Sequence, residues 1–276
     1  MNHNIIITSA GQRVALVRDF KETLVRFYAE AKVFTTDMNP ELAPAAYVSD
    51  GCFEVLRVTD ENYISQLLDI CKKNEIGMIV PTIDTELLVL AENKKLFNDN
   101  DIIVCVSDLD FIKVCRDKRN TGDFLEKHNI RVPKAVDKYN PTFPLFAKPY
   151  DGSLSTNLHY IKNAEELTQD ILDDPKLLFM EYIDKETYKE YTIDMYYGTD
   201  NCVKCIVPRE RIKIRAGEIN KGRTVKCPLM DYIKERLDKI EGCIGCICIQ
   251  VFFNPLTEML LVLRLILVFG RRLSSE

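Results

Sequence analysis

The first half of the chain alternates short apolar runs with amphipathic segments. The apolar, β-branched runs that predict strands lie at residues 4–8, 32–36, 79–82 and 102–106. Helical periodicity fills the intervening residues 14–28, 64–74 and 86–96. Because strands that alternate with helices form parallel sheets, we expect an α/β domain with a Rossmann-like parallel sheet.

Polar clusters follow three of these predicted strands, at residues 9–13, 37–39 and 82–86. Parallel sheets bind ligands beyond the carboxyl ends of their strands, so these clusters are candidates for a small-molecule site. Ser9-Ala-Gly-Gln-Arg13 lacks the three-glycine dinucleotide fingerprint, which argues against an NAD-type dehydrogenase. Gly11 in a tight turn and Asp37 as a helix cap or turn residue are the simpler readings.

The pattern changes near residue 112. Beyond a helix expected at residues 118–127, the apolar segments predict hairpins and an α+β arrangement, with strands at residues 143–149, 158–161, 177–183, 192–197 and 203–208. A further helix is expected over residues 164–172. We therefore divide the chain into residues 1–112 and 113–276, and the second part into lobes 113–183 and 184–276.

Charge and composition exclude several classes of protein. The 276 residues include 37 Lys and Arg against 42 Asp and Glu, and a net charge of −5 argues against nucleic acid as a partner. The longest apolar run, Met259–Phe269, contains Arg264 and is too short to span a membrane. The first residues do not read as a secretory signal, so we expect a cytoplasmic protein with reduced thiols. Cys243, Cys246 and Cys248 are expected to pack as apolar groups, with a zinc site as the alternative.

Lys148 is the most informative single residue. It ends an apolar strand and precedes Pro149 and a loop rich in small hydroxyl residues, Asp151–Asn157. A lysine beside consecutive backbone N–H groups and hydroxyls suits the β- and γ-phosphates of a nucleotide. The alternative is a solvated lysine at the start of an ordinary hairpin.

A row of basic residues follows in Arg209-Glu-Arg-Ile-Lys-Ile-Arg215. In an extended strand, Arg209, Arg211, Lys213 and Arg215 share one face, opposite Glu210, Ile212 and Ile214. Neighbouring cations repel one another, so the row suggests a polyanionic ligand. An edge strand protected by charge is the alternative.

These features occur in an order that resembles the ATP-grasp superfamily, in particular its carbamoyl-phosphate-synthase-like members. Lys118 precedes Lys148 and its loop, then come Met180-Glu-Tyr-Ile183, Glu190-Tyr-Thr-Ile-Asp194, the arginine row and Gln250. The resemblance extends to about Glu258. It implies a pre-ATP-grasp domain followed by a two-lobed ATP-grasp domain. The loop has fewer glycines than is usual in the family.

The resemblance also implies roles for residues. Lys118 and Lys148 would bind ATP phosphates, with a lid loop that includes Gly152, Ser153, Ser155 and Thr156. Glu181, Tyr182 and Ile183 would form the hinge that reads the adenine, and Glu190 would bind the ribose hydroxyls. The catalytic arginines Arg209, Arg211 and Arg215 would face the transferred phosphoryl group and the substrate acid. Gln250 would be the first metal ligand.

The implied function is a ligase that uses ATP and Mg²⁺, with Mn²⁺ as an alternative metal, to activate a small carboxylate as an acyl phosphate. An amine then attacks this intermediate. The expected partners are therefore small carboxylates and amines, not nucleic acid or membrane, and a homodimer is compatible with the resemblance. The alternative is a catalytically inactive ATP-binding or scaffold protein with the same fold.

The last residues depart from the family pattern. Where the family carries Glu-Ile-Asn-Pro-Arg-Phe-Gly, with Glu and Asn as the remaining metal ligands, this chain has Leu263-Arg-Leu-Ile-Leu-Val-Phe-Gly270. One choice of codons for residues 263–269 encodes Glu-Ile-Asn-Pro-Arg-Phe in another reading frame. We therefore hypothesise that a truncated or frameshifted end has replaced the metal-binding strand, which the coding DNA can test. Alternatively, Met259–Phe269 is an apolar strand that simply packs.

Overall fold

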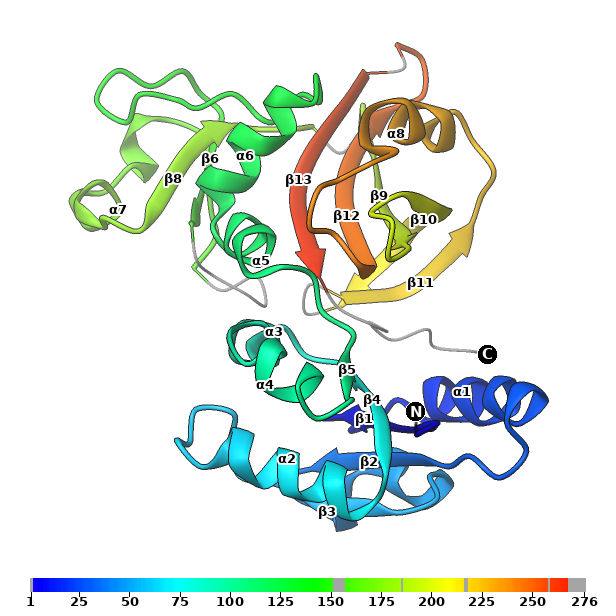
Figure 1. Cartoon of the computed structure of the whole chain (residues 1–276). Coiled ribbons are helices and arrows are strands. Elements are labelled where there is room, and N and C mark those ends of the chain that lie inside the picture. Colours follow the sequence, from blue (N-terminus) through cyan, green and yellow to red (C-terminus); the bar gives the residue numbers. More distant parts are fainter. Residues whose placement is uncertain (1, 151–156, 185, 216–217, 258, 268–276) are drawn as a thin grey trace.

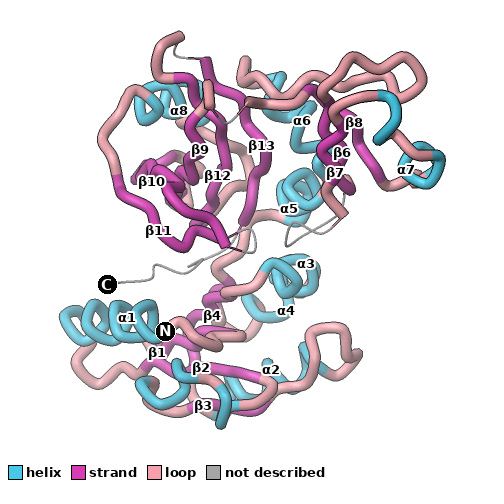
Figure 2. Tube along the Cα trace, turned by 180° about the vertical axis from the view of Figure 1, so that it is seen from behind, coloured by secondary structure: helices cyan, strands magenta, loops and turns pink. Residues whose placement is uncertain are grey.

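The computed structural model describes residues 2–150, 157–184, 186–215, 218–257 and 259–267. These residues form three β-sheets. In Figure 1 the N-terminal sheet lies at the bottom, and the other two lie side by side above it, an arrangement that Figure 2 shows from behind. The expected α/β fold class, with a parallel N-terminal sheet and antiparallel sheets after it, is confirmed.

The N-terminal sheet is parallel throughout. Its order is β3 (Cys52–Glu54), β2 (Val33–Asp37), β1 (Asn4–Thr8), β4 (Ile76–Pro81) and β5 (Ile103–Val104). Ile5 and Ile7 of β1 share a core with α1 (Val14–Phe27), whereas Ile6 belongs to the core of α2 (Tyr63–Lys73) and α3 (Asp84–Glu92). Both faces are therefore buried, as parallel sheets require, and polar groups are left to the strand ends.

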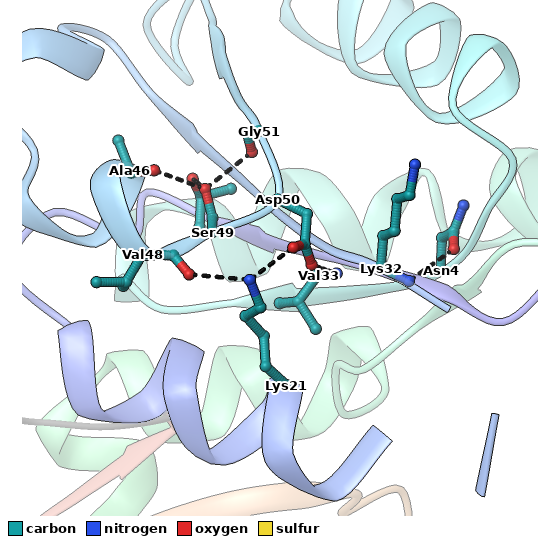
Figure 3. A network of polar contacts seen from close by, with 10 residues as sticks. Asn4, Lys21, Lys32, Val33, Ala46, Val48, Ser49, Asp50 and Gly51 are labelled. Atoms are coloured by element: carbon teal, nitrogen blue, oxygen red, sulfur yellow. Dashed lines mark hydrogen bonds and ion pairs between the residues drawn. The ribbon is translucent and has the colours of Figure 1, made fainter. Parts of the chain in front are cut away.

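An ion pair ties α1 to the segment before β3 (Figure 3). Lys21 Nζ lies 2.6 Å from Asp50 Oδ1 and donates to the carbonyl of Val48, which ends the 3-10 helix η2 (Pro44–Val48). The other oxygen of Asp50 accepts the N–H of Val33 at 2.8 Å. Asp50 thus satisfies a backbone donor at the start of β2 while it anchors the helix that covers the sheet.

The first lobe of the second part carries an antiparallel sheet of order β7 (His159–Ile161), β6 (Leu145–Pro149) and β8 (Leu177–Glu181). One face packs Leu145, Ala147 and Phe179 toward Leu167 and toward Ile171 of α7 (Gln169–Asp173). Two helices, α5 (Leu109–Arg116) and α6 (Lys118–Lys127), precede the sheet, and α5 crosses the division expected near residue 112.

The second lobe is an antiparallel sheet with one buried and one polar face. Its order is β11 (Glu218–Thr224), β10 (Val203–Arg215), β9 (Lys189–Tyr197), β12 (Gly245–Asn254) and β13 (Met259–Leu267). Tyr191, Ile193, Met195 and Tyr197 of β9 are buried in the core that contains Ile233 of α8 (Leu229–Leu237). The residues that alternate with them, Glu190, Thr192 and Asp194, point to the opposite face, which we call the open face.

The short segment 131–135, which follows α6, is bonded to both lobes. The N–H of Val262 in β13 donates to the carbonyl of Arg131 at 3.0 Å. Lys134 and Glu181 exchange bonds, because Glu181 N donates to Lys134 O and Glu181 Oε1 accepts Lys134 N, both at 2.9 Å. Ala135 forms an isolated bridge to Met180. The segment therefore joins the end of β8 to the edge strand β13.

The sequence predictions differ from the structure in the length of several elements. The helix expected over residues 86–96 is two helices, α3 and α4 (Lys94–Asn98), because Asn93 Nδ2 bonds the carbonyl of Val89 and closes α3. The helix expected over residues 164–172 is a 3-10 turn, η3 (Ala164–Glu166), followed by α7. Across the described residues, no helix has the length and apolar character that crossing a bilayer requires.

Candidate functional site

Lys118 and Lys148 line the same pocket, of about 200 Å³, between α6 and the β7-β6-β8 sheet. Lys118 Nζ donates to the carbonyls of Pro149 at 2.7 Å and Tyr150 at 3.2 Å, so its ammonium lies against the end of β6. Lys148 is half-buried and pairs across the sheet with Leu178. The remaining lining is largely apolar: Thr121, Gly122, Leu125, Val132, Pro133, Ala135, Leu178, Phe179, Met180 and Val262, together with Arg119.

The pocket lies at the base of the expected lid loop. Arg119 stacks its guanidinium 4.0 Å from the ring centre of Tyr150, the last described residue before that loop. The lid residues Gly152, Ser153, Ser155 and Thr156 lie outside the described residues. The structure thus brings the two lysines together and places both next to the start of the loop.

The expected hinge joins the two lobes. Glu181 ends β8 and is bonded to Lys134, as described above. The ring of Tyr182 lies 4.3 Å from that of Tyr160. Ile183 is buried in a small cluster with Phe252 and Leu261 of the second lobe. Glu181, Tyr182 and Ile183 therefore lie between the two antiparallel sheets, and their role as a hinge stays a prediction.

A second group of site residues lies on the open face of the second lobe. Glu190 Oε1 lies 2.8 Å from Arg211 Nε and also accepts a hydrogen bond from Gln250 Nε2. Arg211 Nη1 donates to Thr192 Oγ1 at 3.1 Å. The side chains of Arg211 and Glu190 are 6% and 11% exposed, so this ion pair is largely shielded from water.

Arg209, two residues before Arg211 in β10, forms a similar ion pair with a carboxylate of β9. Its Nε lies 2.7 Å from Asp194 Oδ2, and the two side chains are 11% and 40% exposed. Glu210, on the opposite face, pairs instead with Lys189 and Arg223. Thr192 and Asp194 were not predicted as site residues, although their alternation with the buried Ile193 indicates that they share the face of Arg211 and Arg209.

The uninterrupted row of four cations needs correction. Register shifts on both sides of Lys213 in the pairing with β11 break the strict two-residue alternation. Arg209 and Arg211 each pair with a carboxylate of β9, which offsets the repulsion between neighbouring cations. Ile212 and Ile214 are 60% and 38% exposed. The backbone of Arg215 ends β10, and its side chain lies outside the described residues.

The polar strand ends of the N-terminal sheet also meet. Glu86 accepts hydrogen bonds from Thr8 Oγ1 at 2.7 Å, Ser9 Oγ at 2.5 Å and Tyr63 OH at 2.9 Å. Burial raises the pKa of Glu86, and the hydroxyl donors partly oppose that shift. Arg13 donates to the carbonyls of Thr82 and Ser9. Two of the three predicted clusters are thus joined in one network.

The cysteines of residues 243–248 contribute to packing. Cys243 and Cys248 are buried, and burial raises the pKa of Cys243 and of Cys246 to about 12 each. Thiols with such pKa values are neutral at physiological pH. Over the part of the chain that the structure describes, no three His, Cys, Asp or Glu side chains are grouped so that they could hold a metal.

Solved structures share this architecture. The structure of N5-carboxyaminoimidazole synthetase from Staphylococcus aureus is similar over 98% of this chain and 73% of that one, with a TM-score of 0.72 and 16% identity. Biotin carboxylase from Campylobacter jejuni, solved with β,γ-ATP, matches 97% of this chain and 66% of its own, with a TM-score of 0.72 and 13% identity.

A third structure is the biotin carboxylase domain dimer of 2-oxoglutarate carboxylase from Hydrogenobacter thermophilus, in complex with MgADP, ADP and bicarbonate. It matches 97% of this chain and 64% of its own, with a TM-score of 0.69 and 13% identity. The chain therefore has the ATP-grasp fold, as the resemblance implied.

Residues 5–105 match the family model of the PylC-like, N-terminal domain. The comparison with curated proteins gives no match.

Proposed function

We propose that the chain binds ATP in the pocket of Lys118 and Lys148 and uses it to activate a small carboxylate for attack by an amine. The observation that carries the proposal is that both lysines line a single pocket at the base of the lid loop. Two lysines that line a largely apolar pocket suit a ligand with an aromatic base and a phosphate chain. The ATP-grasp fold, whose relatives include structures solved with ADP and β,γ-ATP, supports that ligand.

The chemistry requires two anions to approach each other. A carboxylate oxygen attacks the γ-phosphorus of ATP, the bond to the β-phosphate oxygen breaks, and ADP leaves. The amine then attacks the acyl carbon, loses a proton and expels inorganic phosphate. Lys118 and Lys148 would offset the charge of the phosphates, and Arg209, Arg211 and Arg215 that of the moving phosphoryl group and the acid. Glu181, Tyr182 and Ile183 would bind the base.

The described residues do not fit a divalent cation well. Gln250 offers an amide oxygen, but its carboxylate neighbour Glu190 is already paired with Arg211, whose positive charge opposes a metal. Gln250 pairs in register with residue 264 of β13, where the sequence has Arg rather than an oxygen ligand. When bound, Mg²⁺ would supply charge neutralisation at the phosphates, and none of the roles proposed here depends on it.

This poor fit favours a second function, nucleotide binding without catalysis. Such a protein would keep the lysine pocket and the hinge but would release no ADP with any acid. A homodimer, as named for the Hydrogenobacter domain, is a further proposal that light scattering would test.

The test measures ATP binding by isothermal titration calorimetry, followed by ADP release with panels of acids and amines. Lys148→Ala should weaken ATP binding at least ten-fold. The matched control Lys95→Ala, an exposed lysine of α4 that pairs with Asp99, should have no effect. ADP release that depends on an acid supports the ligase, and binding without ADP release supports the second function. Equal affinities for the Lys148 and Lys95 variants would refute the pocket assignment.

A further inference from the structure

We infer that Glu86 is a positioning residue for the amine substrate of the proposed ligase: it holds the turn between β1 and α1, residues 9–13, in the conformation that meets this substrate. The inference rests on the proposed function and adds to it a role for the polar network of the N-terminal sheet. Glu86 is buried, so it acts through the turn and does not touch the substrate.

The carboxylate of Glu86 collects hydrogen bonds from two other elements. Glu86 lies in the first turn of α3 and is 1% exposed. It accepts the hydroxyls of Thr8 and Ser9 at the end of β1, and that of Tyr63 from α2. Among the described residues, its hydrogen-bond partners are hydroxyls rather than cations. Burying a carboxylate is costly, and this one is bonded to two consecutive residues that lead into the turn.

The turn begins with a strained residue. Ser9 has a φ of 50°, in the left-handed region that residues other than glycine rarely adopt. Its Oγ donates to Glu86 at 2.5 Å, and its carbonyl accepts a hydrogen bond from Thr82 Oγ1 at 2.7 Å. Its N–H donates to Thr36 Oγ1 at 3.3 Å. A strained conformation persists where its surroundings hold it from several sides, and such residues cluster at functional sites.

The turn presents charged groups around a glycine. The position that a Cβ of Gly11 would take lies 3.9 Å from Arg13 Nη1 and 4.0 Å from Asp37 Oδ2, and Asp37 ends β2. Arg13 is oriented by its hydrogen bonds to the carbonyls of Ser9 and Thr82. The direction of this guanidinium therefore depends on the conformation of Ser9, which Glu86 holds. The carboxylate of Asp37 suits the ammonium form of an amine.

The turn lies at the edge of the N-terminal sheet that faces the second lobe. All strands of a parallel sheet end at one edge, and ligands bind beyond it. Beyond β5, at this edge, Ser107 Oγ donates to the carbonyl of Ile244 at 3.1 Å and accepts its N–H at 3.0 Å, directly before β12 (Figure 1). The proposed function assigns the acid to the arginines of the second lobe. The amine would therefore be held from the opposite side, by the turn.

The experiment measures steady-state ADP release by the full chain, with the acid and the amine that support the fastest release. We expect Glu86→Ala to raise the KM for the amine about ten-fold, while the KM values for ATP and for the acid stay within about two-fold. Glu86→Gln, whose amide oxygen still accepts hydrogen bonds from hydroxyls, should restore most of the affinity for the amine. A general loss of stability would not select one of three substrates.

Tyr63→Phe is the matched control. It removes a hydrogen bond to the same carboxylate, but Tyr63 belongs to α2 and not to the turn. We expect Tyr63→Phe to lower the stability in urea and to leave the KM for the amine unchanged.

A double-mutant cycle tests whether Glu86 acts through Ser9. Ser9→Ala removes the hydroxyl that Glu86 holds and should raise the KM for the amine in the same direction. The effects of Ser9→Ala and Glu86→Ala should not add, because both break the same contact. If Glu86→Ala does not fold, Ser9→Ala still provides the test, since it leaves the buried carboxylate in place.

Several outcomes would overturn the inference while leaving the ligase intact. These are an unchanged KM for the amine in Glu86→Ala or Ser9→Ala, equal changes for all three substrates, the same change in Tyr63→Phe, or additive effects in the cycle. If the unaltered chain releases no ADP with any acid and amine, the proposed ligase fails, and the inference fails with it.

Discussion

The N-terminal sheet and the five-stranded sheet of the second lobe bury their strands differently. The parallel sheet is covered on both faces, so its polar network lies at the strand ends, around Glu86. The antiparallel sheet packs one face on α8 and leaves the other face for Glu190, Arg211 and Gln250. In one sheet a polar site is placed by where the strands end, and in the other by every second residue along them.

The largest effect expected from this comparison concerns the buried face of the second lobe. Ile193 is fully buried at the centre of β9, and Ile193→Ala should lower the free energy of unfolding by about 3 kcal/mol, because it removes packed methyl groups and leaves a cavity. Ile212→Ala, at a position that is 60% exposed, is the control and should change the stability by less than about 0.5 kcal/mol. Urea unfolding measures both. Similar losses would contradict the burial of Ile193 in the packed core of this sheet.

If the open face continues onto β13, substitutions in that strand should create ligands for a metal ion. The backbone register pairs residues 264 and 266 with Gln250 and Cys248, so we expect Arg264→Glu combined with Ile266→Asn to add two oxygen ligands to the strand that neighbours Gln250. Affinity for Mg²⁺ in the presence of ATP should rise about ten-fold, measured by calorimetry. Placing the same two residues at the exposed positions 212 and 214 should have no such effect. An unchanged affinity in the β13 variant would show that the open face does not continue onto β13.

The smallest effect concerns the strand ends of the N-terminal sheet. Since burial raises the folded-state pKa of Glu86 above the ordinary value of 4.5, the protonated form is favoured in the folded protein. The resulting contribution to stability is present below about pH 4.5 and is lost as the pH rises through the folded-state pKa.

Glu86→Gln should remove this dependence. The slope of the free energy of unfolding with pH should change by less than about 1.4 kcal/mol per pH unit, the limit for one proton, as determined by urea unfolding at a series of pH values. Identical slopes for Glu86→Gln and the unaltered chain would show that the carboxylate is not penalised by its burial.

The same contrast explains how much of the fold could be predicted from the sequence. Strand β1 is a short apolar run, Asn4–Thr8, whose bounds the pattern gives directly, whereas the three-residue strand β3, Cys52–Glu54, was not predicted. In the second lobe the alternation of Glu190 to Asp194 predicts a strand with one polar face. The strand β11, whose sequence is Glu-Ile-Asn-Lys-Gly-Arg-Thr, lies at an edge and lacks an apolar face, so periodicity does not reveal it. Helix α8 was not predicted, although the four-residue spacing of Leu229, Ile233 and Leu237 indicates a helix with one apolar face.

The candidate site was predictable in its composition but not in its contacts. The sequence identifies Lys118 and Lys148 as basic residues of the first lobe, yet their common pocket depends on how α6 packs on β6 and β8. Likewise, the alternation of the arginine row indicates a shared face, whereas the carboxylates that neutralise it come from another strand. Long-range pairing of this kind depends on strand register, which composition and periodicity leave open.

The segment 131–135 has a mechanical consequence. Its backbone is bonded to β8 through Lys134 and to β13 through Arg131, so the two lobes share a common axis at this point. Any opening that admits a nucleotide must leave these bonds intact or break several at once, and a rotation about the segment satisfies the first condition. The two lobes should therefore rotate relative to each other about residues 131–135, with the greatest displacement at the edges farthest from this segment.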